Sequence, residues 1–154
     1  LIMQPRIKMG LIVGVVGLVL NVCVSGFIGL CGPFASMLAG GVAGFLTANQ
    51  EKLTTKADGA RAGAIAGGIA GGLMIIGQMI GGVIALVLMQ TSGTQLPFGT
   101  IPTGDDPSMM AIFYLSGLGT GLCFGIFGAA LAAGAGAGAG YFGTPDQPAA
   151  TPTL

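Results

Sequence analysis

The chain has 154 residues, of which 53% are hydrophobic and 31 are glycine, while only 6% are charged. A soluble domain carries about 25% charged residues, so the five bases and five acids here cannot cover the surface of a water-soluble globule. The composition excludes an ordinary soluble enzyme or binding domain. It predicts an all-α integral membrane protein.

The chain lacks histidine, and this excludes several kinds of chemistry. Without imidazole there is no His ligand for haem or a metal, and no Ser-His-Asp or Cys-His catalysis. The net charge is zero and no basic run supplies the positive surface that nucleic-acid binding requires. We therefore expect no enzymatic activity, no catalytic residues, no metal site, no cofactor held by this chain alone and no nucleic-acid partner. Membrane lipid is an expected partner.

Two apolar spans are expected in the first third of the chain. Residues 9–30 would form about 33 Å of helix, enough for a hydrocarbon core of about 30 Å. Arg6 and Lys8 before this run resemble the start of a signal peptide. The run is about twice the length of a signal peptide's apolar region, so we expect it to be retained. Gly32-Pro33 interrupts the run and suits the start of a second, shorter span over 33–48.

A polar loop over 49–61 leads into a third apolar helix over 59–90. Asp58 is suited to be the N-cap of this helix. A helix of this length would extend roughly 48 Å, more than a bilayer requires. We expect the excess at the end where glycine and alanine are concentrated.

The fourth span is expected over 108–142, after a loop rich in Gly, Pro and Thr. Asp106 supplies an N-cap and Pro107 suits the first helical position. Residues 1–142 then form one transmembrane domain of about four helices. The Pro/Thr-rich tail over 143–154 is expected to be disordered.

The positions of the basic residues predict the orientation. All five precede residue 62, and they are Arg6, Lys8, Lys52, Lys56 and Arg61. By the positive-inside rule the N-terminus and the 49–61 loop are cytoplasmic. An even number of crossings must separate them, which supports the break at Gly32-Pro33. The loop over 91–107 then faces outward, and the C-terminus is cytoplasmic.

Small residues recur at intervals of four along three of the spans, which predicts glycine-zipper packing. Residues four apart lie on one helix face, so each row is a groove along which another helix backbone can approach closely. The helix-packing positions predicted in this way are Gly63, Gly67, Gly71, Gly117, Gly121 and Gly125. Further rows contain Ala60, Ala64, Gly68 and Gly72 in the third span, and Gly128, Ala132, Gly136 and Gly140 in the fourth. Because a bundle of four needs fewer grooves, we expect an outward contact with other subunits, through Gly67, Gly71, Gly121 or Gly125.

Polar side chains are scarce at membrane depth. Every acid and base lies in a loop, a tail or a helix end, so no intramembrane carboxylate is present for proton coupling as in a pump or rotary proteolipid. Asn21 and Gln78 can hydrogen-bond to each other across a helix interface, which we prefer to a substrate site. Cys23, Cys31 and Cys123 lie in apolar runs without CxxC spacing, which predicts packing residues.

The segment from Gly32 to Gly82 contains GGVAGFL at 40–46, a short polar loop and DGARAGAIAG at 58–67. This pattern resembles a hairpin of small uncharacterised prokaryotic membrane proteins, which are domains of unknown function. The resemblance covers about a third of the chain. It implies a prokaryotic plasma (inner) membrane and brings no assigned activity.

Two functions remain open. One is a non-catalytic structural or accessory subunit that packs against a larger membrane complex, such as a respiratory or photosynthetic complex. The other is a small homo-oligomeric channel or facilitator. A pore needs a polar stripe along one helix, and Asn21, Gln78, Ser116 and Thr120 are too few and too scattered to form one. We therefore prefer the accessory subunit, with other membrane subunits or further copies as partners.

Overall fold

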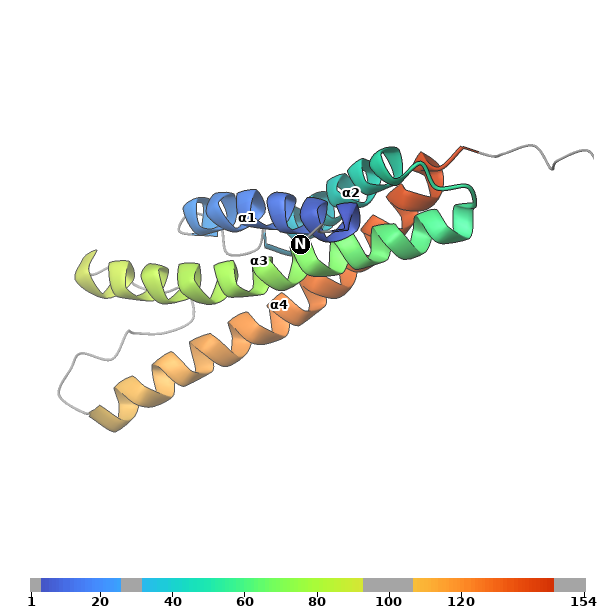
Figure 1. The fold of residues 1–154 in the computed structure, drawn as a ribbon. Helices are drawn as coiled ribbons and strands as arrows, with labels where there is room; N and C mark the ends of the chain where they lie inside the picture. Colours follow the sequence, from blue (N-terminus) through green and yellow to red (C-terminus); the bar gives the residue numbers. More distant parts are fainter. Residues whose placement is uncertain (1–3, 26–31, 93–106, 146–154) are drawn as a thin grey trace, which may run out of the picture.

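The structure is a computed structural model that describes residues 4–25, 32–92 and 107–145. All regular secondary structure in these ranges is helical (Figure 1). Four helices follow one another, and they are α1 (Pro5–Ser25), α2 (Gly32–Glu51), α3 (Lys56–Ser92) and α4 (Pro107–Gly143). The predicted all-α class and the number of helices are confirmed.

Parts of three predicted segments lie outside the described residues. They are 26–30 of the first span, 93–106 of the outer loop and 146–154 of the tail. Elsewhere the predicted helix boundaries differ from the observed ones by a few residues. The main difference is the polar loop, because α2 continues to Glu51 and only residues 52–55 separate it from α3.

The start of α3 corrects the predicted cap. The helix begins at Lys56, so Thr55 and not Asp58 occupies the N-cap position. The Thr55 hydroxyl accepts a hydrogen bond from the Asp58 backbone N–H at 3.1 Å and donates one to Asp58 Oδ2 at 2.7 Å. This arrangement is related to a capping box. Just before it, Lys52 has a φ of 46°, the left-handed conformation that commonly ends a helix, here after α2.

The α3 helix lies at the centre of the bundle and contacts each of the other three helices. The residue numbers of contacting pairs increase together along α1 and α3. A Cβ at Gly10 would meet Ala66, and one at Gly14 would meet Ala70. These two helices therefore run in the same direction. Figure 1 shows α3 and α4 side by side near the α2–α3 loop and separating toward their other ends.

Small residues fill the interior of the bundle, and large apolar side chains lie outside. The buried hydrophobic residues are Ala43, Ala48, Ala62, Ala66, Ala70, Met74 and Ala132. In contrast, Phe34 is 74% exposed, Leu38 71% and Leu115 67%. A soluble protein buries its Leu and Phe side chains, whereas helices packed in lipid place small residues between them. This distribution is that of a membrane protein.

Three of the four helices are long and apolar enough to cross a membrane, namely α1, α3 and α4. The α2 helix is not among them, although its 20 residues would extend about 30 Å. Its inward face carries Ser36 and Thr47, both fully buried, which lower its hydropathy. The Thr47 hydroxyl donates to the Ala43 carbonyl at 2.8 Å, so it is satisfied within α2. A fourth crossing stays a prediction.

An ion pair joins the start of α1 to the end of α2. The backbone N–H and the Nε–H of Arg6 both donate to Glu51 Oε1, at 3.0 and 3.1 Å. The Glu51 side chain is only 7% exposed. The α3 helix begins a few residues after α2 ends, so its first residues lie at the same end of the bundle. All charged residues of the described ranges lie at this end: Arg6, Lys8, Glu51, Lys52, Lys56, Asp58 and Arg61.

Candidate functional site

The α3–α4 pair is tightest where α2 also meets it. An added Cβ at Gly136 would lie too close to the Gly63 carbonyl oxygen, 3.1 Å from the Gly40 carbonyl oxygen and 3.1 Å from Gly67 Cα. Gly136 is therefore the point at which the backbones of three helices approach one another. Such close approach favours van der Waals contact and weak Cα–H···O bonds between helices in lipid.

Three of the predicted packing glycines, Gly63, Gly67 and Gly71, lie against α4. A Cβ at Gly71 would be 2.8 Å from Ala129 Cα, and those at the other two would meet α4 carbonyl oxygens. This corrects the outward contact expected at Gly67 and Gly71. Their face has no space for a methyl group, because α4 of the same chain already occupies it.

The other three predicted positions lie where α4 separates from α3. Gly125 is buried, and a Cβ there would be 3.1 Å from Gln78 Oε1. A Cβ at Gly117 would meet only the end of the Leu86 side chain, at 2.9 Å. At Gly121 it would meet no atom of the described residues within 4 Å. This row faces α3, but across an increasing gap.

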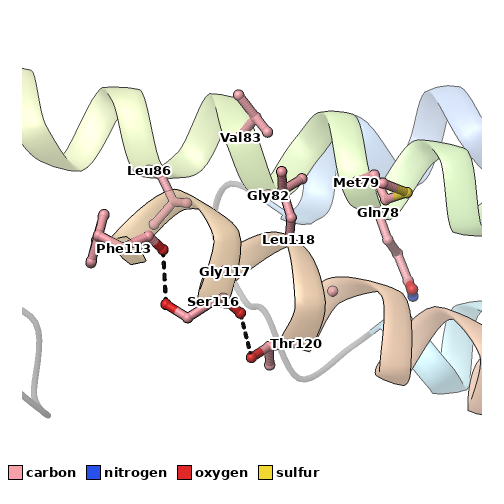
Figure 2. A pocket seen from close by; sticks show the side chains of 11 residues that line it. Gln78, Met79, Gly82, Val83, Leu86, Phe113, Ser116, Gly117, Leu118 and Thr120 are labelled. Carbon is pink, nitrogen blue, oxygen red and sulfur yellow. Dashed lines mark hydrogen bonds between the residues drawn. The ribbon is translucent and has the colours of Figure 1, made fainter. Parts of the chain in front are cut away.

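A cleft of about 470 Å³ lies between the two helices where they separate (Figure 2). Residues 78–86 of α3 and 113–121 of α4 form its walls, which are mainly apolar. Two hydroxyls in the wall are satisfied within α4: Ser116 donates to the Phe113 carbonyl at 3.0 Å and Thr120 to the Ser116 carbonyl at 2.8 Å. Because their protons are used within α4, these hydroxyls can offer only acceptor lone pairs.

Contacts between α3 and α4 lie beyond both ends of the cleft. On one side α3 and α4 meet at Gly125. On the other, the Tyr114 hydroxyl donates to Gln90 Oε1 at 2.6 Å, and Gln90 Nε2 donates to Met110 Sδ at 3.3 Å. Neither Gln90 nor Tyr114 was predicted to make a contact between the helices. Their positions in the sequence could have indicated this contact, because a polar and an aromatic residue lie near the ends of two spans that are joined by one loop.

The predicted hydrogen bond between Asn21 and Gln78 is absent. Asn21 is 4% exposed on α1, and its Nδ2 has no hydrogen-bond partner among the residues described. Gln78 Oε1 is also buried without a partner in this part of the chain. Its amide lies beside Gly125 of α4, while α1 packs mainly on α2 and α3.

In the part of the chain that the structure describes, the acidic and cysteine side chains do not gather into a metal site. Within the described ranges no three His, Cys, Asp or Glu side chains lie close enough to hold a metal ion. Cys123 is free and exposed on α4, so it fills no space inside this chain, contrary to its predicted packing role. The side chains of Cys23 and Cys31 lie outside the described part.

The geometry thus offers a tight small-residue interface and an apolar cleft between α3 and α4. Comparison with models of protein families, with curated proteins and with solved structures finds no match to this chain. Its function has to be inferred from its own contacts.

Proposed function

We propose that the chain is a non-catalytic structural or accessory subunit of a larger membrane complex, and that the small-residue row of α3 contacts its partner. That row consists of Ala60, Ala64, Gly68 and Gly72. A Cβ at Gly68 or Gly72 would meet no atom of the described residues within 4 Å. The preceding residues, Gly67 and Gly71, are packed against α4. This uncovered groove carries the proposal, because small-residue grooves are where membrane helices associate.

We further propose four crossings, glycine-zipper packing of α2, α3 and α4, and cytoplasmic termini in a prokaryotic plasma membrane. The outward face of α2 supports its crossing, because Phe34, Leu38 and Phe45 are exposed and apolar while small residues face inward. The Arg6–Glu51 pair supports a common side for the α1 start and the α2–α3 loop. The basic residues gathered there favour the cytoplasmic side.

Thiol labelling checks this topology. In a variant without the native cysteines, a single cysteine replacing Thr54 is expected to react with an impermeant reagent only from the cytoplasmic side. Cysteines replacing Phe34 and Thr91, at the other end of the bundle, are expected to react only from outside. Labelling of Phe34→Cys from the same side as Thr54→Cys would show that α2 does not cross.

The uncovered groove is tested by Gly68→Leu and Gly72→Leu. The Cβ of each leucine would meet no atom of the described residues within 4 Å, so the thermal stability of the monomer should change little. Recovery of partner chains after mild-detergent purification should fall at least about tenfold, since close backbone approach is lost. The matched control is Gly41→Leu on α2, which is equally open and should retain the partners.

An unchanged partner set in Gly68→Leu would remove the proposal's main support. Recovery of further copies of this chain, without other proteins, would favour the alternative function of a small homo-oligomeric channel or facilitator. In that case the same row would be a self-association face, and native mass spectrometry would give its copy number.

A further inference from the structure

Three basic side chains on different elements face away from the bundle interior. Lys8 of α1, Lys52 after α2 and Arg61 of α3 are exposed, and none makes a side-chain hydrogen bond or ion pair with the described residues. Lys8 lies two residues from Gly10, which packs on α3, so it is on the opposite face of α1. Arg61 lies two turns before Gly68, on the face where an added Cβ would meet no atom of the described residues within 4 Å.

These three bases, here called the basic band, lie within about one helical turn of one another along the bundle axis. The contacting pairs of α1 and α3 keep a constant offset in residue number. By this offset Arg61 is level with Pro5, and Lys8 is about 4.5 Å further along the axis. Lys52 follows Glu51, whose carboxylate accepts a hydrogen bond from the first turn of α1. The basic band therefore occupies one depth.

The acidic residues at this end of the bundle do not neutralise the basic band. The Glu51 side chain is 7% exposed and is paired with Arg6. Asp58 accepts a hydrogen bond from the Thr55 hydroxyl at the first turn of α3, at 2.7 Å. Over the described ranges this end carries five bases and two acids, a net charge of +3. It presents positive charge to its surroundings.

Aromatic side chains indicate that this end of the bundle lies at the surface of the membrane. Tyr141 and Phe142 are exposed near the end of α4, and Lys56 Nζ lies 5.3 Å from the centroid of the Tyr141 ring. Gly140 packs against Gly59, so these rings are level with the first turns of α3. Tyrosine is enriched where hydrocarbon meets headgroups, and lysine side chains extend to the same level.

We propose that the basic band binds the phosphate groups of anionic phospholipids in the leaflet that surrounds it. A base close to an anionic membrane surface contributes about fivefold in affinity. Because the three bases belong to three elements and face outward, they suit the headgroups of a surrounding lipid layer better than one small anion.

The inference requires that the bundle crosses a membrane, but it depends neither on which side this end faces nor on a partner subunit. Arg61 shares a face of α3 with the proposed subunit interface at Gly68. Lys8 and Lys52 belong to other elements, so lipid binding and subunit association can fail separately.

The test uses the purified full chain in phosphatidylcholine bilayers with a trace of spin-labelled phosphatidylglycerol or spin-labelled phosphatidylcholine. Electron paramagnetic resonance separates lipids held at the protein surface from free lipids. We expect an association constant at least about twofold higher for phosphatidylglycerol, because only the lipids beside a base gain the full electrostatic contribution. The preference should decrease at high salt, which screens exposed charges.

Two matched variants separate charge from folding. In Lys8→Gln/Lys52→Gln/Arg61→Gln the preference should disappear, whereas Lys8→Arg/Lys52→Arg/Arg61→Lys keeps the charges and should keep the preference. Both variants should melt at the same temperature as the parent chain, because the three side chains make no ion pair or hydrogen bond with the described residues.

Equal association of the two lipids with the parent chain would overturn the proposal, as would a preference that survives in the glutamine variant. Inorganic phosphate should lower the preference no more than sodium chloride does at the same ionic strength. A larger effect of phosphate would identify a site for the free anion instead of lipid. A preference that appears only after a bound polypeptide is removed would assign the bases to a subunit interface, and would also overturn the proposal.

Discussion

Gly136→Leu is expected to lower the free energy of unfolding by about 3 kcal/mol or more, at the upper end of the cost of overpacking. The leucine Cβ would collide with the Gly63 carbonyl and approach Gly40 and Gly67 at 3.1 Å. Backbone atoms from two helices would have to move, because the three nearest atoms are all backbone atoms. Denaturant or thermal unfolding in detergent, followed by circular dichroism, measures the loss.

The same helix provides the control. Gly134→Leu and Gly138→Leu make the same chemical change two residues away, where a Cβ meets no atom of the described residues within 4 Å. Their stability should stay within about 0.5 kcal/mol of the parent chain. If Gly136→Leu unfolds like these controls, α4 does not pack against α2 and α3 through this face.

Arg6→Ala is expected to lower the free energy of unfolding by about 2 kcal/mol. Breaking a buried ion pair costs about 3–5 kcal/mol because one charge is left unpaired, and water reaching the partly exposed Arg6 reduces this. The carboxylate left behind is Glu51, whose side chain is 7% exposed. Of the donors in the described ranges, the backbone N–H of residue 6 would still donate to it.

Two further variants separate the ion pair from a general effect of charge. Lys8→Ala removes an exposed base at the same helix end and should change stability by less than about 0.5 kcal/mol. The double variant Arg6→Ala/Glu51→Gln should recover part of the loss, because the buried charge is removed with its partner. Equal losses in Arg6→Ala and Lys8→Ala would contradict the pairing of α1 with α2.

The sequence was sufficient to predict the four helices because residues that favour helix ends, or that are charged, separate the apolar segments. Gly32-Pro33 and Pro107 mark the starts of α2 and α4, and the basic residues mark one end of the bundle. The predicted N-cap of α3 was wrong because Thr55 and Asp58 are both good capping residues and lie three positions apart. The choice between them depends on where the α2–α3 loop ends, which no local preference fixes.

The direction of each small-residue row could not be predicted. Gly67 and Gly68 are neighbours with the same composition around them, yet one is packed against α4 and the other is open. Only the tertiary arrangement decides which row is covered. The cleft has a clearer signal, since α4 carries Phe113 and Leu118 in its first half and mainly glycine and alanine in its second. That gradient of side-chain size already favours two helices that separate.

The Gly/Ala junction of α2, α3 and α4 has a further consequence, which concerns entropy. Gly136, Gly63 and Ala132 have no rotamers to lose, so joining helices through them costs almost no side-chain conformational entropy. At the cleft, Met79, Leu86 and similar side chains would lose that freedom if the helices closed on them. Because this entropic term grows with temperature, warming acts unevenly along the α3–α4 pair. It opposes closure of the cleft half and leaves the glycine half almost unaffected.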